Sequence, residues 1–81
     1  MLRIAIKTKR SPEEVIKQAV DFFGPNGYKL EIKEKSAGCA YFEGGGGGVD
    51  VIACSEGKAT AVEFTSREWD YQVNEFIDKI H

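Results

Sequence analysis

The chain has 81 residues, of which 42% are hydrophobic and 30% charged, and its formal net charge is −2. A chain this short supports one hydrophobic core, so we expect a single domain over residues 1–81. The acidic balance argues against nucleic acid as a partner, and the apolar runs are too short to cross a membrane. The N-terminus lacks the long apolar stretch of a signal peptide, which predicts a cytoplasmic protein.

Chemistry-bearing residues are few. Cys39 and Cys54 are the only cysteines, and neither lies in a CxxC motif or a Cys/His cluster. A small secreted scaffold usually carries more, so both are expected to be unreactive thiols in a reducing compartment. The single histidine, His81, is the last residue and a poor candidate for catalysis. The sequence therefore predicts no cofactor and no enzymatic activity.

The first half of the chain predicts a strand and a helix. Residues 2–6 alternate between aliphatic and polar or small side chains, which is the period of a half-buried strand. Ser11-Pro12-Glu13-Glu14 predicts a helix start, with Ser11 as N-cap and Glu14 completing a capping box. Gly24-Pro25-Asn26-Gly27 ends this helix, because glycine tolerates a left-handed φ and proline cannot continue the hydrogen-bond ladder.

The second half predicts four strands and a second helix. The strand-like runs cover residues 28–33, 39–44, 49–54 and 58–65, and turn signals separate them. Thr65-Ser66-Arg67-Glu68 resembles a second capping box, which opens a helix with a buried stripe at Trp69, Val73, Phe76, Ile77 and Ile80. The order β-α-β-β-β-β-α predicts an α+β domain in which a curved five-stranded antiparallel sheet carries two helices on one face.

The turns suggest a register for the sheet. If Gly46-Gly47 forms one hairpin tip, Cys39 faces Cys54 and Phe42 faces Val51. If Glu56-Gly57 forms the next, Val51 faces Val62 and Val49 faces Phe64. A three-residue loop at Ser36-Ala37-Gly38, with Gly38 left-handed, sets Ile32 opposite Phe42. One face then collects the apolar side chains of Leu30, Ile32, Ala40, Phe42, Val49, Val51, Ala53, Val62 and Phe64, and a one-residue slip would scramble that set.

This register has a consequence on each face. On the outer face it aligns Glu31, Glu43, Asp50 and Glu63 in one row, although like charges directly opposite each other are destabilising. Glu43, Asp50 and Glu63 are thus a weak candidate site for Ca²⁺ or Mg²⁺, or a surface for a basic partner; the alternative is a solvated face screened by nearby lysines. On the inner face, the row Glu34, Ala40, Ala53 and Thr60 is small or polar. Either a helix approaches closely there or a pocket remains.

The five consecutive glycines at positions 44–48 invite comparison with a phosphate-binding loop. A Walker loop requires a following Lys-Ser/Thr and a helix, whereas Val49-Asp50 leads into a strand. The run therefore favours a mobile hairpin, with a lid over a ligand as the alternative.

The element order is similar to the TATA-binding-protein-like fold and to a shortened helix-grip fold, as in START and plant-allergen lipid binders. In those folds a long C-terminal helix lies across a curved antiparallel sheet. The stretch Glu63-Phe64-Thr65-Ser66-Arg67-Glu68-Trp69-Asp70-Tyr71-Gln72-Val73 also resembles the tail of small prokaryotic proteins to which no activity attaches. The larger helix-grip relatives carry extra strands and a second early helix that enlarge the cavity, and this chain lacks them.

Two function hypotheses follow. The first is a small binding domain that holds a compact apolar ligand between the sheet and the C-terminal helix, at Ala40, Ala53, Thr60, Trp69, Val73 and Phe76. The second is a protein-interaction module, monomeric or homodimeric, that uses the outer sheet face around Tyr41 and Ile52, or an edge strand, to dimerise or dock a partner. A cation site in the carboxylate row is a distant third.

Overall fold

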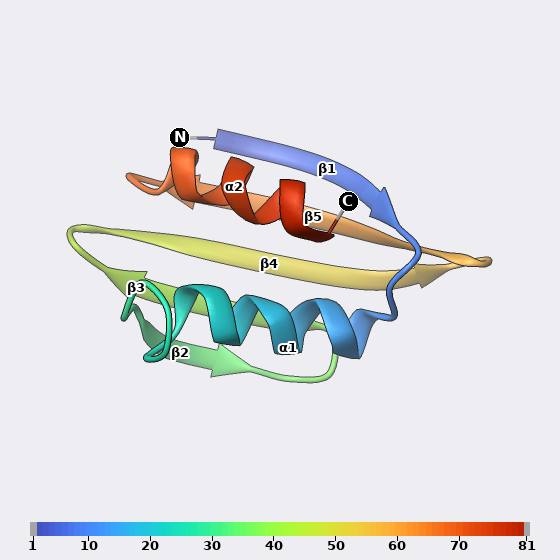
Figure 1. Ribbon diagram of the computed structural model, residues 1–81, viewed down its shortest axis with the longest axis horizontal. Coiled ribbons are helices and arrows are strands. Elements are labelled where there is room, and N and C mark those ends of the chain that lie inside the picture. The colour runs from blue at the N-terminus through green and yellow to red at the C-terminus, as the bar shows by residue number, and fades with distance from the viewer. Residues whose placement is uncertain (1, 81) are drawn as a thin grey trace.

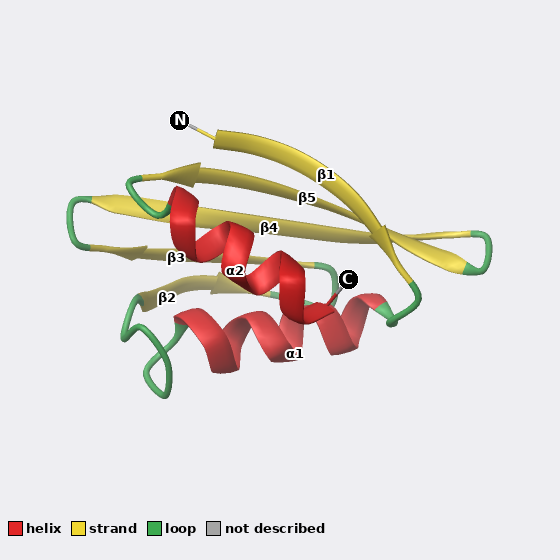
Figure 2. Cartoon of the chain, turned by 45° about the horizontal axis from the view of Figure 1, so that its top comes forward, coloured by secondary structure: helices red, strands yellow, loops and turns green. Residues whose placement is uncertain are grey.

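The computed structural model describes residues 2–80, drawn as ribbons in Figures 1 and 2. The elements in chain order are β1 (Leu2–Thr8), α1 (Pro12–Phe23), β2 (Glu31–Lys35), β3 (Cys39–Gly44), β4 (Gly47–Glu56), β5 (Ala59–Arg67) and α2 (Asp70–Ile80). The α+β class and the element order predicted from the sequence are confirmed. Within residues 2–80, neither helix is long and apolar enough to cross a membrane.

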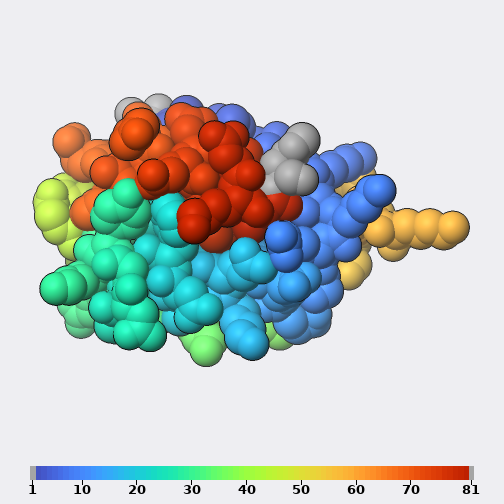
Figure 3. All heavy atoms as spheres, viewed as in Figure 1, coloured from blue at the N-terminus to red at the C-terminus, as the bar shows by residue number. Residues whose placement is uncertain are grey.

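The five strands form one antiparallel sheet in the order β1-β5-β4-β3-β2. Short turns join β2 to β5 into a meander, while α1 carries the chain from β1 at one edge to β2 at the other. Both helices lie on the same face of the sheet (Figures 1 and 2), with α1 over β3 and β4 and α2 over β5. The sheet therefore has one face covered by α1 and α2, whose atoms lie in front in the space-filling view of Figure 3, and one outer face.

The core fills the space between this helical layer and the sheet. Phe23 of α1 packs its ring against Phe42 of β3 and Phe76 of α2, with ring centroids 5.6 and 5.4 Å apart. The side chains of Val51 and Phe64 are completely buried beneath the helices. Every apolar residue expected on the inner face lies in this core or packs against it. The predicted inner face is thus confirmed.

Helix α1 begins as its sequence predicts and ends for a different reason. The Ser11 Oγ accepts a hydrogen bond of 3.2 Å from the Glu14 backbone N–H, which confirms Ser11 as the N-cap. At the other end Gly24 has a φ of −78°, so the expected left-handed conformation is wrong. Glycine is needed there because an added Cβ would lie 2.4 Å from the Val20 carbonyl oxygen.

The second predicted capping box is wrong, because Thr65 and Ser66 belong to β5. Thr65 and Ser66 pair with β1 on one side and with β4 on the other. Ladder hydrogen bonds on both sides outweigh the local capping preference of these two residues. The chain then turns at Glu68, whose φ is +69°, and α2 starts at Asp70.

The β3–β4 register differs from the predicted one by two residues. The hairpin tip is Gly45-Gly46, with φ values of +58° and +82°, rather than Gly46-Gly47. Phe42 consequently lies opposite Val49 instead of Val51. Because side chains alternate with a period of two, this shift preserves the inner face and changes only the rows across it.

The β4–β5 register is also shifted by two residues, since its tip is Gly57-Lys58. Val51 therefore faces Phe64 rather than Val62. The predicted pairing of Ile32 with Phe42 is confirmed, but a bulge follows between Ile32 and Glu34. This bulge, rather than a left-handed Gly38, accommodates the loop: positive φ among the glycines of residues 2–80 is confined to positions 45, 46 and 57.

Candidate functional site

The expected inner row of small residues does not form. Ala40 lies opposite Val51, Ala53 lies opposite Val62, and Thr60 lies opposite Ser55, so the three belong to different rows. The structure places Ala40, Ala53, Val73 and Phe76 in the close-packed core, and each is at most 3% exposed. Phe76, for example, packs its ring against those of Phe23 and Phe64, with centroids 5.4 and 5.9 Å apart.

Thr60 has a structural partner. Its Oγ1 donates a hydrogen bond of 2.6 Å to the Arg10 carbonyl oxygen. Thr8, opposite it on β1, donates through Oγ1 to the Ile80 carbonyl oxygen at 2.8 Å and accepts from the Arg10 N–H at 3.3 Å. The two hydroxyls thus tie the end of β1, the loop after it and the last turn of α2 together.

Trp69 also has a structural partner, the glycine hairpin. Its Nε1 donates a hydrogen bond of 2.9 Å to the Gly44 carbonyl oxygen. A Cβ on Gly45 would lie 3.2 Å from the indole Cζ2. The Tyr28 ring packs edge-on to the indole, with centroids 5.8 Å apart. The glycine run thus has a packing role that its sequence did not predict.

The predicted four-carboxylate row is wrong, since the register splits it. Glu31 and Glu43 do face each other, but the next residue across is Gly48. Asp50 lies opposite Tyr41, and Glu63 lies opposite Ile52, two rows away from Glu43. Within residues 2–80, no three His, Cys, Asp or Glu side chains gather closely enough to hold a metal ion.

Asp50 of that set has a raised pKa. Partial burial on the outer face raises the pKa of its carboxyl above the ordinary 3.8, and the negative charges of Glu34 and Glu63 raise it further. Tyr41 beside it donates its hydroxyl to Glu43 at 3.0 Å, and this hydrogen bond raises the pKa of the tyrosine. The centre of the outer face is therefore acidic.

The two cysteines are free thiols and do not face each other as the predicted register required. Cys39 lies opposite Ile52, and its Sγ is 3.0 Å from the Ser36 Oγ. Cys54 is exposed and lies opposite Ala61. The structure thus places the thiols on different rows of the outer face.

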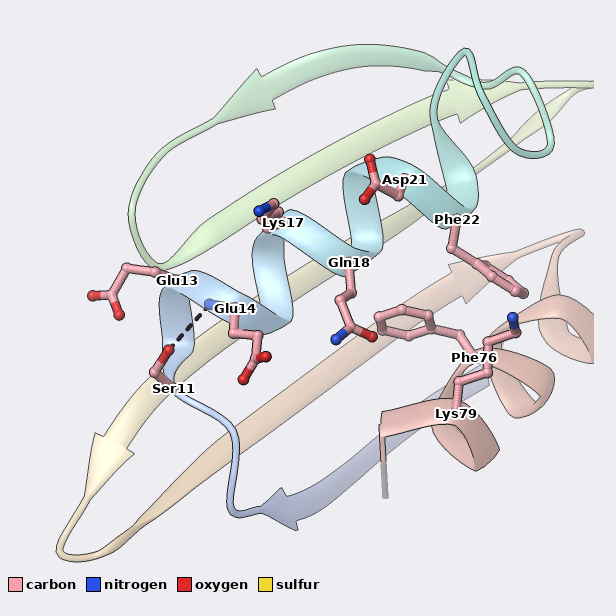
Figure 4. Close-up of a pocket in the computed structure, with 9 residues that line it drawn as sticks. All are labelled: Ser11, Glu13, Glu14, Lys17, Gln18, Asp21, Phe22, Phe76 and Lys79. Carbon is pink, nitrogen blue, oxygen red and sulfur yellow. Dashed lines mark hydrogen bonds between the residues drawn. The ribbon is translucent and has the colours of Figure 1, made fainter.

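An open groove of about 670 Å³ runs between the two helices. Figure 4 shows Phe22 from α1 and Phe76 from α2 converging on it, with Gln18 beside the Phe76 ring. Charged side chains of both signs form the rim, and the Lys79 Nζ lies 5.5 Å from the Phe22 ring centroid. The groove is thus amphipathic, and it lies between the helices rather than between the sheet and α2.

The β2 edge of the sheet is short and charged. It has five residues, of which Glu31, Lys33, Glu34 and Lys35 are charged and exposed. The bulge after Ile32 interrupts its pairing with β3. Short length, charge and bulges are the features by which proteins keep an edge strand from pairing with another chain.

The β1 edge lacks most of those features. Its seven residues pair with β5 in an unbroken register, and within residues 2–80 no segment pairs with its other side. It has only two charged residues: Arg3 pairs with Glu63 at 3.3 Å and Lys7 with Glu56 at 2.8 Å, as Lys33 pairs with Glu31 on β2 at 3.3 Å. In Figure 1 β1 borders the sheet with no element beyond it.

The inner side of β1 is not completely covered. Leu2, Ile4 and Ile6 point toward the helical layer but stay partly exposed, because α2 lies over β5 rather than over β1. Glu75 accepts a hydrogen bond of 2.6 Å from the Tyr28 hydroxyl, so the side of α2 that carries Glu75 faces the β2 edge of the sheet. At about 100° per residue Ile77 lies roughly 200° around the helix from Glu75, on the β1 side. We call Leu2, Ile4, Ile6 and Ile77 the aliphatic strip.

Comparison with known proteins adds no family to this description. A scan of protein-family models and searches of curated proteins and of solved structures found no match to the chain. The candidate sites therefore stand on the geometry of residues 2–80 alone, and the predicted role of His81 lies outside the described residues. The sequence carried one signal for the β1 edge, the alternation of residues 2–6, but nothing in it marked that strand as an edge.

Proposed function

We propose that this protein is a protein-interaction module that accepts an added β-strand at the free edge of β1. The observation that supports it is the contrast between the two edges: β2 is short, charged and bulged, whereas β1 is regular and carries a partly exposed aliphatic strip. A free edge offers a row of backbone donors and acceptors, and partner strands use these for affinity.

The aliphatic strip supplies a reason for association beyond backbone hydrogen bonds. Completing the burial of a partly exposed isoleucine or leucine contributes about 0.5 kcal/mol, a fraction of the value for a fully exposed side chain. Leu2, Ile4 and Ile6 alternate along β1, so an added strand with aliphatic residues at every second position would cover all three.

The experiment is an NMR titration of the ¹⁵N-labelled protein with a capped heptapeptide of alternating isoleucine and threonine. We expect saturable amide shifts along Leu2–Thr8 and at Ile77, and none along β2. The control peptide has the same sequence with alternate residues N-methylated, which removes the backbone donors on one side. It is expected to bind at least tenfold more weakly.

Other patterns of shifts would reject the edge. Shifts centred on Tyr41 and Ile52 would assign docking to the outer face, where the Ile52 side chain is 41% exposed. Equal shifts along Glu31–Lys35 would mean that the two edges do not differ. If neither peptide causes amide shifts, strand addition is rejected as the function.

A second candidate function is the binding of a compact, partly apolar ligand. The resemblance to helix-grip lipid binders suggests it, and the groove between α1 and α2, with the partly exposed Phe22 in its wall and the buried Phe76 ring beneath it, supports it. Drug-sized ligands occupy pockets of about 300–1,000 Å³, a range that includes this groove. Saturable shifts at Gln18, Phe22 and Phe76 with a small apolar library would support this candidate, and their absence across the library would reject it.

A further inference from the structure

We infer that the strand added at β1 is the β1 of a second copy of this chain, paired antiparallel about a two-fold axis through Ile4. This inference rests on the proposed function and names its partner. An isologous contact uses the same surface on both copies, so the strand must be complementary to itself. The alternation, the charges and the aliphatic strip of β1 test that condition one by one.

Alternation restricts the registers in which the strand can face its own copy. Directly opposed residues in an antiparallel pair project to the same face. Leu2, Ile4 and Ile6 occupy even-numbered positions of β1, so only registers that oppose even with even residues bring the aliphatic side chains of two copies together. Axes through Ile4, Ala5 or Ile6 satisfy this rule and keep most of the strand paired.

The axis through Ile4 gives the best aliphatic match. It sets Ile4 against Ile4 of the second copy and Leu2 against Ile6 of the second copy. All three aliphatic residues of β1 then meet an aliphatic residue, and their uncovered sides are buried. The axis through Ile6 instead opposes Ile4 to Thr8, whose hydroxyl is already bonded to the Ile80 carbonyl oxygen.

The charged residues of β1 distinguish the two remaining axes, which pass through Ile4 and Ala5. An axis through Ala5 opposes Arg3 to Lys7 of the second copy, and like charges directly opposite each other destabilise a strand pair. With the axis through Ile4, Arg3 faces Ala5, a small residue that leaves the guanidinium on its own Glu63. The charges therefore favour the same axis as the aliphatic match.

The helical layer extends this contact. Ile77 lies on the β1 side of α2, so the two-fold axis brings the two α2 helices to flank the paired strands with Ile77 facing the junction. The result is one ten-stranded antiparallel sheet with all four helices on the same face. Since the contact consists of one strand and a narrow strip, its area is at the low end of stable interfaces, and we expect a dissociation constant of roughly 10 µM.

Single-cysteine cross-linking tests both the partner and the axis. The background is the double variant Cys39→Ser/Cys54→Ser, which removes the two native thiols. Four substitutions are made separately in this background. Three lie on β1, namely Ile4→Cys, Ala5→Cys and Ile6→Cys, and Lys33→Cys on the β2 edge is the matched control. Two cysteines that oppose each other on the axis lie within disulfide reach. A cysteine one position away from the axis has its Cα about 8 Å from the Cα of the same position in the second copy.

We expect Ile4→Cys to form covalent dimer in a glutathione redox buffer at least tenfold faster than the other three variants. Sedimentation velocity of the unmodified chain from 5 to 500 µM is expected to show reversible dimers. Fastest cross-linking at Ala5→Cys or Ile6→Cys would overturn the axis. A strictly monomeric chain with equal, slow cross-linking everywhere would overturn the second copy as partner, while peptide shifts along β1 would still support strand addition. If the chain forms no dimers and the peptide causes no shifts along β1, the proposed function itself is rejected.

Discussion

β1 and β2 border the same sheet, yet they leave their unpaired backbone groups in different surroundings. β2 has five residues, four of them charged, and a bulge that breaks its pairing with β3. β1 has seven residues in unbroken register, two charged residues, and three partly exposed aliphatic side chains. Protection of one edge and not the other is what a molecule with one docking edge requires.

Both edge strands are tied to the helical layer by hydrogen bonds. Thr8 at the end of β1 is bonded through its hydroxyl to the last turn of α2. The segment that enters β2 is bonded to both helices, since the Leu30 N–H donates to the Phe23 carbonyl oxygen at 2.8 Å and the Tyr28 hydroxyl donates to Glu75. The end of the proposed docking edge is therefore fixed by a buried hydroxyl, and a fixed edge loses little conformational entropy when a strand is added.

The largest expected effect comes from placing a charge at the centre of the docking edge. In a dimer with its axis through Ile4, Ile4→Lys sets two ammonium groups against each other in an aliphatic surrounding. We expect the dissociation constant to rise at least 30-fold, equivalent to about 2 kcal/mol. The matched control, Ile32→Lys on β2, should leave the dissociation constant unchanged in sedimentation velocity. An equal loss in both variants would remove the distinction between the edges.

The next effect concerns the anchor of β1. Thr8→Val keeps the shape of the side chain but leaves the buried Ile80 carbonyl oxygen without its hydroxyl donor. We expect the free energy of unfolding to fall by about 1.5 kcal/mol in urea denaturation. Thr65→Val, on the outer face of β5, is the control and should change it by less than about 0.5 kcal/mol. No difference between the two variants would show that the Thr8 hydroxyl does not anchor the edge.

A smaller effect is expected at the other end of the molecule. Trp69→Phe keeps an aromatic ring beside Tyr28 but removes the donor to the Gly44 carbonyl oxygen. We expect a loss of about 1 kcal/mol in the free energy of unfolding and faster hydrogen exchange at Gly45–Gly47. Tyr71→Phe, on an exposed ring of the same helix, is the control. Unchanged exchange in the hairpin would contradict the packing role of Trp69.

The smallest effect is expected on the outer face between the two edges. The pKa of the Asp50 carboxyl is raised in the folded protein, so its ionisation favours the unfolded state. Stability from this group is therefore lost as the pH rises from 3.8 through the raised value. Asp50→Asn should gain about 0.5 kcal/mol at pH 7, limited by solvent screening, and gain nothing below pH 3.8.

Urea denaturation of Asp50→Asn from pH 3 to pH 8 measures this gain, with Asp78→Asn on the exposed side of α2 as the control. A gain that grows toward low pH would reverse the sign and contradict the burial of Asp50. Since Asp50 lies away from both edges, the same variant should leave the dissociation constant of the dimer unchanged.

The sequence by itself determined the element order, the Ser11 cap and the face on which each apolar strand residue lies. These depend on local chemistry and on a period of two, which survives a register error of two residues. Five consecutive glycines offer several equivalent turns, so local preference could not choose Gly45-Gly46. Contacts from Trp69, distant in sequence, fasten the hairpin where it is.

Tertiary structure alone decided the rest. Pairing with β1 and β4 held Thr65 and Ser66 in a strand although their sequence favours a helix cap. The register separated Asp50 and Glu63 from Glu43 and moved Ala40 and Ala53 into different rows of the core. Whether a strand lies at an edge depends on the order of strands in space, which no local pattern encodes. The edge position of β1, on which the proposed docking depends, is for that reason a property of the fold rather than of residues 2–8.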